Sequence, residues 1–141
     1  MAYSGRMGTD GLLDTLRAFF ARRGRSVVCA YLYGSTARGE ARPASDVDIA
    51  VLLCHTPPAT VEGLGFDLAG DLERLLSRRV DLVILNRASP DLVHRVLRDG
   101  VLLHESDRRL RVAFETRSRA EYFDVLPYLR EYRRSSAGRP S

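Results

Sequence analysis

A glycine-serine pair and two aspartates stand close together in this sequence and form its most informative pattern. Gly34 and Ser35 are followed, after ten intervening residues, by Asp46 and Asp48. At such a turn, backbone N–H groups and one hydroxyl can face an anion, and Arg38 adds a forked positive charge nearby. Carboxylates bind hard divalent cations, and those cations also bind substrate phosphates. The pattern therefore predicts a site for a phosphate group and a divalent cation.

Two apolar stretches flank the turn and must position it. Val27–Tyr33 is rich in β-branched and aromatic residues and ends at a glycine, which predicts a buried strand. Val47–Leu53 predicts a second strand, in which successive side chains face opposite sides of a sheet. Asp46 and Asp48 then face the same side. Their repulsion would raise a pKa unless a cation lay between them, and magnesium or manganese suits that position.

A third aspartate lies inside another apolar stretch. Residues 80–85 read as a β-rich strand, yet they include Asp81, a charge that a plain core strand would not carry. We expect Asp81 to join Asp46 and Asp48. An Asp-x-Asp pair alone is common in a chain with 18 acidic residues, and most such pairs are solvated turns. The ordered set of strand, Gly-Ser turn, Asp-x-Asp strand and third acidic strand is much more specific.

In this order the residues resemble a known family. The segments 33–39, 45–51 and 80–82 are similar to those of the minimal nucleotidyltransferases (MNT), small members of the DNA-polymerase-β-like nucleotidyltransferase superfamily. The resemblance covers about residues 9–105. It implies an α/β (α+β) fold, the nucleotidyltransferase fold, with a small mixed β-sheet flanked by helices.

The resemblance also implies roles for the motif residues. Nucleotide binding would fall to the turn, Gly34, Ser35, Thr36 and Arg38. Catalysis and metal binding would fall to the aspartates, Asp46, Asp48 and Asp81. Two Mg²⁺ ions, or Mn²⁺, about 3.5–4 Å apart would stabilise the attacking and leaving oxygens of an in-line displacement. Attack on the α-phosphate of ATP would then release pyrophosphate, and Asp81 would help to deprotonate the acceptor hydroxyl.

The same resemblance implies a protein partner. MNT proteins typically pair with HEPN-domain toxins, and members resembling this one act as antitoxins that transfer AMP from ATP to a toxin tyrosine hydroxyl. Larger relatives append a helical domain that helps to hold the base or the acceptor, and this chain has no room for one of that size. We therefore expect the acceptor to come from another molecule.

Helical spacing of apolar residues predicts the remaining elements of a domain at 9–105. The first helix begins at Thr9 or Asp10 and ends before Gly24, and the second has its apolar face between residues 61 and 76. A third helix has Ser89 as N-cap and Pro90 as its first residue, and it ends at Gly100. Residues 101–104 predict a last short strand. Residues 1–8 are expected to be disordered.

The C-terminal segment differs in charge from the rest of the chain. Residues 106–141 hold nine arginines against five acids and so carry the whole net charge of +4. We predict a helical extension at 106–133, capped by Ser106 and interrupted by Pro127 after about Leu126, and a disordered tail at 134–141. Its aromatic residues among arginines indicate either a docking surface or a solvated helix that covers the edge of the core.

Other functions remain open at this level. A small-molecule nucleotidyltransferase of the aminoglycoside type would use the same metal cluster, but the sequence reveals no acceptor pocket. A non-catalytic antitoxin or nucleic-acid-binding module could use the basic tail, although a net charge of +4 is modest. Arg98 and His104 have the Arg-x5-His spacing of HEPN ribonucleases, but they straddle Gly100 and so read as a coincidence. With no membrane span or signal-peptide core in the sequence, we expect a cytoplasmic protein.

Overall fold

Four strands form one mixed sheet in the computed structural model, which describes residues 9–39, 45–56 and 64–137. The strands, in the spatial order β3-β2-β1-β4, are β1 (Val27–Tyr33), β2 (Val47–Leu53), β3 (Val80–Ile84) and β4 (Val101–Glu105). β1 is antiparallel to both of its neighbours, and β2 is parallel to β3. The predicted mixed sheet is thus confirmed.

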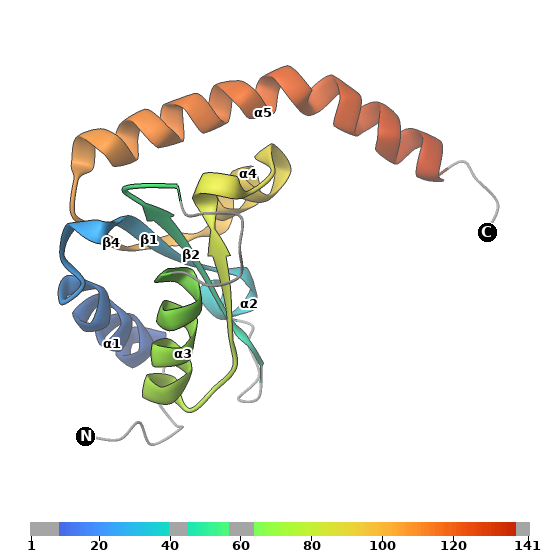
Figure 1. The fold of residues 1–141 in the computed structure, drawn as a ribbon. Helices are drawn as coiled ribbons and strands as arrows, with labels where there is room; N and C mark the ends of the chain where they lie inside the picture. Colours follow the sequence, from blue (N-terminus) through green and yellow to red (C-terminus); the bar gives the residue numbers. More distant parts are fainter. Residues whose placement is uncertain (1–8, 40–44, 57–63, 138–141) are drawn as a thin grey trace.

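Helices cover both faces of the sheet, so the domain has three layers (Figure 1). The helices are α1 (Thr9–Ala21), α2 (Gly34–Ala37), α3 (Leu64–Leu76), α4 (Pro90–Asp99) and α5 (Arg108–Ala137), with short 3₁₀ turns at Gly24–Ser26 and Leu85–Arg87. α1 and α3 pack on one face, and α4 and the first half of α5 pack on the other. The expected start of the second helix at residues 61–63, the N-terminal residues 1–8 and the tail residues 138–141 lie outside the described residues.

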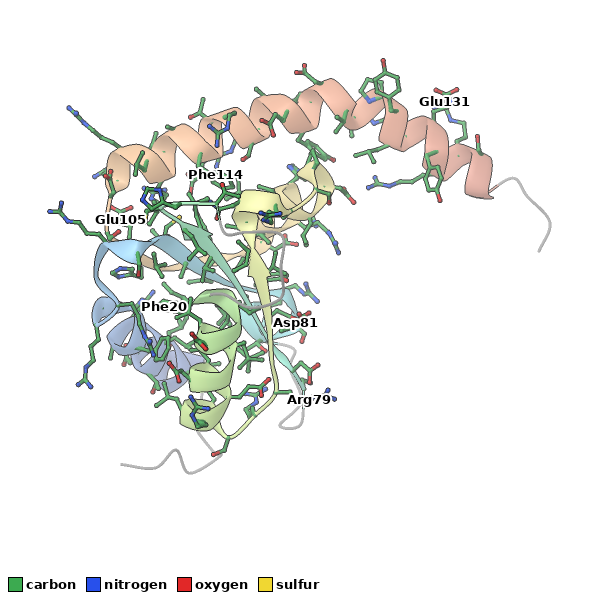
Figure 2. All side chains as sticks on the ribbon, in the orientation of Figure 1. Phe20, Arg79, Asp81, Glu105, Phe114 and Glu131 are labelled. Carbon is green, nitrogen blue, oxygen red and sulfur yellow. The ribbon has the colours of Figure 1, made fainter. Side chains whose placement is uncertain are left out.

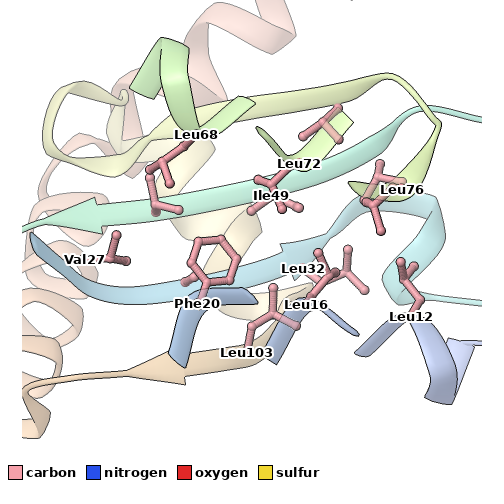
Figure 3. Packing of buried hydrophobic residues seen from close by; sticks show 14 of the residues in the cluster. Leu12, Leu16, Phe20, Val27, Leu32, Ile49, Leu68, Leu72, Leu76 and Leu103 are labelled. Atoms are coloured by element: carbon pink, nitrogen blue, oxygen red, sulfur yellow. The ribbon is translucent and has the colours of Figure 1, made fainter. Parts of the chain in front are cut away.

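Side-chain alternation along the strands divides the core in two. Val47, Ile49 and Val51 of β2 point to the α1/α3 face, where apolar side chains of both helices meet them. Figure 3 shows Phe20, from α1, and Leu72, from α3, among the buried apolar side chains of this layer. The even-numbered residues of β2 face α4 and α5 instead. This alternation gives the sheet two faces that can differ in chemistry.

A small polar network fixes the first half of α5 to the sheet. The Tyr31 hydroxyl of β1 donates to Glu115 Oε1 of α5 at 2.6 Å. Arg111 Nη1 donates to the same carboxylate oxygen at 2.9 Å, and Arg111 Nε donates to Glu105 of β4. Phe114 lies beside this network and is buried. The helix is thus held by charged hydrogen bonds around one aromatic anchor.

Two predictions about α5 are wrong. Asp107 rather than Ser106 caps the helix, because Asp107 Oδ1 accepts a hydrogen bond from the Leu110 amide at 3.0 Å, whereas the Ser106 hydroxyl donates to the Val27 carbonyl at 2.7 Å. Pro127 lies inside the helix, and the helix continues to Ala137, including residues 134–137 that we expected in a disordered tail.

The physical reason is that proline weakens a helix without having to end it. A proline removes one backbone hydrogen bond and crowds the preceding turn, which can produce a bend instead of a break. Figure 1 shows α5 changing direction in its orange-to-red part. Beyond the proline, Arg133 Nη2 donates to Asp91 Oδ1 of α4 at 3.1 Å, so a tertiary contact supports the last turns. None of the helices in the described part of the chain combines the length and the apolar character that crossing a membrane requires.

Candidate active site

Strand register brings the motif residues to one end of the sheet. Asp48 of β2 pairs with Tyr33 of β1 on one side and with Asp81 of β3 on the other. Partners in register lie on the same face, so the two aspartates are neighbours on the face that α4 covers. Gly34 follows Tyr33 directly and begins α2. The turn and both acids therefore meet where β1 ends and β2 and β3 begin.

A cavity of about 530 Å³ opens at this meeting point. Its lining comes from five elements and includes Tyr33, Gly34, Ser35, Arg38, Asp48, Asp81, Val83, Leu92, Arg95 and Asp99. β1 and α2 form one wall, β2 and β3 form the floor with the two carboxylates, and α4 forms the opposite wall. Figure 2 shows Asp81 at the edge of the sheet below α4. Acidic, basic and apolar groups thus share one cavity of ligand size.

Gly34 is required at its position for two independent reasons. Its φ of +75° lies in the left-handed region that side chains disfavour. In addition, a Cβ on Gly34 would overlap the Asp48 carboxylate, because Asp48 Oδ2 lies against the Gly34 Cα. The glycine therefore lets the acid approach the turn that we expect to bind phosphate. The first reason follows from the residue type, and the second depends on the fold.

Negative charge is concentrated around Asp48. Burial raises the pKa of this carboxyl above its ordinary value, and the charges of Asp81 and Asp46 raise it further, while Arg38 lowers it. The phenol of Tyr33 responds to the same acids, since burial and the charges of Asp48 and Asp81 raise its pKa to about 12. Acids that raise one another's pKa in this way favour a bound cation.

The donor set fits a hard divalent cation. Asp48 and Asp81 offer carboxylate oxygens from adjacent strands, the ligand type that Mg²⁺ and Mn²⁺ prefer. Within residues 9–39, 45–56 and 64–137, no three His, Cys, Asp or Glu side chains converge closely enough to form a complete metal site. Like charges repel, and Mg²⁺ in nucleotide sites characteristically takes only one or two protein carboxylates, with phosphates and waters as its other ligands.

The structure gathers most, but not all, of the candidate residues. The cavity lining includes Gly34, Ser35, Arg38, Asp48 and Asp81. Asp46 does not line it and is exposed, although its charge acts on Asp48. Thr36 also lies away from the cavity, is 4% exposed, and its hydroxyl has no hydrogen-bond partner among the described residues. The short α2 turns Thr36 toward the interior, so it is poorly placed to bind nucleotide. The roles of all these residues stay predictions.

Sequence reasoning missed the wall formed by α4. Leu92, Arg95 and Asp99 line the cavity at a spacing of three and four residues, the spacing of one helix face. That spacing was visible in the sequence, but nothing local indicated that this face of α4 would meet the aspartates. Leu92 is partly buried against the apolar cluster under α4 and also lines the cavity.

The Arg98 and His104 pair does not form a joint site. Arg98 lies on α4 and makes two hydrogen bonds to Asp99, at 3.0 and 2.9 Å. His104 lies on β4, where its ring stacks on Phe20 of the α1/α3 face. The Arg-x5-His spacing is therefore a coincidence of sequence, as expected.

Comparison with known families identifies the domain. A family model described as polymerase beta, nucleotidyltransferase, matches residues 14–109, a span that contains the turn, all three aspartates and the α4 wall. The chain belongs to this nucleotidyltransferase family. No curated protein sequence matches the chain.

Similar solved structures share the nucleotidyltransferase fold. A chain from the crystal structure of a toxin-antitoxin pair with AMP-PNP has a TM-score of 0.75 at 24% identity, over 89% of this chain and 98% of that one. A chain from the complex of a tri-AMPylated HEPN toxin with an MNT antitoxin of Shewanella oneidensis has a TM-score of 0.69 at 22% identity, over 89% and 99%. A candidate minimal nucleotidyltransferase has a TM-score of 0.53 at 33% identity, over 68% and 96%. The expected fold and family resemblance are confirmed.

Proposed function

We propose that this chain is a metal-dependent adenylyltransferase and antitoxin, which transfers AMP from ATP to a tyrosine hydroxyl of a HEPN-domain toxin. The observation that carries the proposal is the register pairing of Asp48 with Asp81 beside Gly34, at the floor of one cavity. Membership of the nucleotidyltransferase family supports the reaction class. The likeness to an MNT antitoxin complexed with an AMPylated HEPN toxin supports the donor and the partner.

The residues of the cavity divide the work of the reaction. Ser35 and the backbone at Gly34 would hold the phosphates, with Arg38 supplying positive charge. Asp48 and Asp81, with Asp46 near them, would hold the divalent cations. Those cations would neutralise the charge on the phosphates and on the attacking oxygen.

In the transfer itself, the acceptor oxygen forms a bond to the α-phosphorus and the bond from that phosphorus to pyrophosphate breaks. Asp81 would accept the hydroxyl proton. Catalysis then depends on positioning and charge neutralisation, as in other phosphoryl and nucleotidyl transfers.

The second half of α5 supports an external acceptor. It carries aromatic side chains that are largely exposed, Phe123, Tyr128 and Tyr132. Figure 1 shows this half reaching past the domain beyond α4. Exposed aromatic residues among arginines are enriched at protein interfaces. We propose that residues 106–133 form the surface on which the toxin docks and from which its tyrosine reaches the cavity.

A labelling experiment tests the proposal. The protein is incubated with Mg²⁺, the product of the adjoining gene as the candidate HEPN protein, and ATP labelled at the α-phosphorus. The wild type should place label covalently on a tyrosine of the HEPN protein and release pyrophosphate, whereas Asp46→Asn and Asp48→Asn should not. ATP labelled at the γ-phosphorus should leave the HEPN protein unlabelled, which separates adenylyl transfer from phosphorylation.

Three results would contradict the proposal. Equal labelling by the wild type and both variants would place the chemistry elsewhere. Label on an added aminoglycoside, with none on the HEPN protein, would support a small-molecule nucleotidyltransferase. A HEPN protein whose ribonuclease activity is blocked without any label would indicate a non-catalytic antitoxin.

A further inference from the structure

α4 presents three different surfaces, and one of them belongs to the cavity. Val93 and Val96 are buried against the sheet. His94 stacks on Tyr122 of α5, with ring centroids 3.6 Å apart. The cavity surface is formed by Leu92, Arg95 and Asp99. α4 is therefore fixed on two sides, and its third side faces the aspartates across the cavity.

Arg95 has two acidic neighbours on its own helix, and both are engaged elsewhere. Asp91, four residues before it, accepts a hydrogen bond from Arg133 of α5 at 3.1 Å. Asp99, four residues after it, accepts two hydrogen bonds from Arg98, and these lower the pKa of Asp99. Each position would normally pair with an arginine one turn away. Arg133 and Arg98 pair with these two acids in place of Arg95.

Among the described residues, the Arg95 guanidinium is consequently left without an acceptor for its donors. Within the described residues its side chain makes no hydrogen bond and no ion pair, and it is exposed at the cavity wall. Arg23, Arg98, Arg111 and Arg133, in contrast, all pair with carboxylates. A planar group with five N–H donors suits an oxyanion such as a phosphate or a carboxylate, which it can bind with two hydrogen bonds.

The surroundings of Arg95 indicate what kind of anion it meets. Across the cavity lie Asp48 and Asp81, which would repel a bare anion. An anion that binds together with divalent cations suits both the acids and Arg95, because the acids bind the cations and the guanidinium binds the anion. Arg38 provides a second guanidinium from the end of α2. Val83 and Leu92 add apolar contacts between the two charged walls.

We propose that Arg95 binds the phosphate chain of the incoming nucleoside triphosphate from the α4 side, opposite Gly34 and Ser35. The inference rests on the proposed function, since it assumes a metal-bound nucleotide in this cavity. It makes Arg95 a binding residue of the active site, and it gives the Arg133–Asp91 and Arg98–Asp99 pairs a role. By occupying the neighbouring acids, these pairs keep Arg95 available for phosphate.

Equilibrium binding in the presence of Mg²⁺ tests this inference. The ligands are an ATP analogue with a non-hydrolysable α,β linkage, and adenosine, which lacks phosphates. Arg95→Gln should weaken binding of the ATP analogue by about tenfold or more, the loss expected for one charge-assisted hydrogen bond. It should leave the affinity for adenosine unchanged. Arg95→Lys, which keeps the charge but loses the fork, should fall between the two.

The matched control is Arg25→Gln. Arg25 is an exposed arginine in the 3₁₀ turn at Gly24–Ser26, and it does not line the cavity, so its loss removes the same charge from the protein at a distance. The control should bind both ligands as the wild type does. Thermal unfolding of each variant checks that α4 remains packed.

The outcomes separate this inference from the proposed function. If the wild type fails to bind the ATP analogue, the proposed function fails and the role of Arg95 fails with it. If the wild type binds and Arg95→Gln binds equally well, only the role of Arg95 is overturned. An equal loss for the ATP analogue and adenosine would also overturn it, because the effect would then come from the shape of the cavity. The inference would also be overturned if Arg95→Gln left nucleotide binding unchanged but slowed labelling of the HEPN protein. That result would mean that Arg95 binds the acceptor.

Discussion

The face of the sheet under α1 and α3 is closed by aliphatic and aromatic side chains, whereas the face under α4 and α5 holds a cavity with carboxylates at its floor. Both faces are built from the same strands. In β2, Ile49 and Val51 point to the closed face, whereas Asp48, which precedes Ile49, points to the open one. A single change of register would exchange the two sets of side chains. The comparison teaches that the closed face supplies stability, while the open face accepts repulsion between like charges as the condition for binding a cation.

Neutralising one acid on the open face should give the largest effect and separate activity from stability. Asp48→Asn should lower adenylyl transfer by about 1,000-fold or more, equivalent to about 4 kcal/mol in the barrier, because a metal ligand is lost. The free energy of unfolding of the metal-free protein should be unchanged or higher at neutral pH. Ionisation of Asp48 above its ordinary pKa of 3.8 opposes folding, and the variant removes that charge.

The control for this variant is Asp14→Asn on the exposed side of α1. It should alter neither transfer nor unfolding. Loss of stability in Asp48→Asn, measured by urea denaturation, would contradict the view that the open face carries unrelieved repulsion.

Deleting a buried side chain from the closed face should have the opposite effect, a loss of stability with little change in activity. Leu16 is 0% exposed in the α1/α3 cluster, so Leu16→Ala should lower the free energy of unfolding by about 2–5 kcal/mol. Transfer per folded molecule should change little. Leu110→Ala, at a leucine that is 50% exposed, should stay within about 0.5 kcal/mol of the wild type. Equal effects of the two substitutions in urea denaturation would show that the closed face is not the main source of stability.

Loss of one hydroxyl on the open face should give a smaller change. Tyr31→Phe removes the donor to Glu115, and the free energy of unfolding should fall by about 1–2 kcal/mol, because the carboxylate keeps its bond from Arg111. Tyr128→Phe, at a tyrosine that is 73% exposed, is the control and should have no effect. An unchanged free energy of unfolding in Tyr31→Phe would mean that Phe114 and the Arg111 contacts hold the first half of α5 without the Tyr31 hydroxyl.

The smallest effect should come from the pH dependence of His104 on the closed side. Burial lowers the pKa of this imidazole below its ordinary value of 6.5, and the charge of Glu105 opposes the shift. The unfolded chain therefore binds a proton at a higher pH than the folded chain does. The contribution to stability is full above pH 6.5 and is lost as the pH falls toward the lowered pKa.

Unfolding measurements between about pH 5 and pH 7 test this sign against His104→Gln, which removes the titrating group. The wild type should lose more stability than the variant as the pH falls, by about 1 kcal/mol or less. A wild type that gains stability relative to the variant on acidification would show that the charged imidazole is favoured.

Much of the fold could be predicted because its signals are local. The bounds of β1 and β2 agree with the predicted runs, since each apolar stretch ends at a turn residue. α4 begins as predicted, and the Ser89 hydroxyl accepts a hydrogen bond from the Leu92 amide at 3.3 Å. A charge inside an apolar strand led us to expect Asp81 near the other acids, and Asp81 lies in register with Asp48, although the pairing of these two strands was not predicted.

The misses depend on contacts between distant residues. α5 passes Pro127 with support from Asp91 of α4, and no pattern within α5 could have indicated that support. Arg95 reaches the cavity because of the way α4 docks on the sheet, which its own spacing does not fix. Thr36 is buried within the short α2, which its place in the Gly-Ser turn does not indicate, and its role stays a prediction.

Direct titration with Mn²⁺ is the most decisive measurement, with binding followed by electron paramagnetic resonance in the presence of a non-hydrolysable ATP analogue. If carboxylates from two adjacent strands share one cation centre, Asp48→Asn and Asp81→Asn should each weaken Mn²⁺ binding by about tenfold or more while both proteins stay folded. Wild-type affinity for Mn²⁺ in either variant would contradict the account.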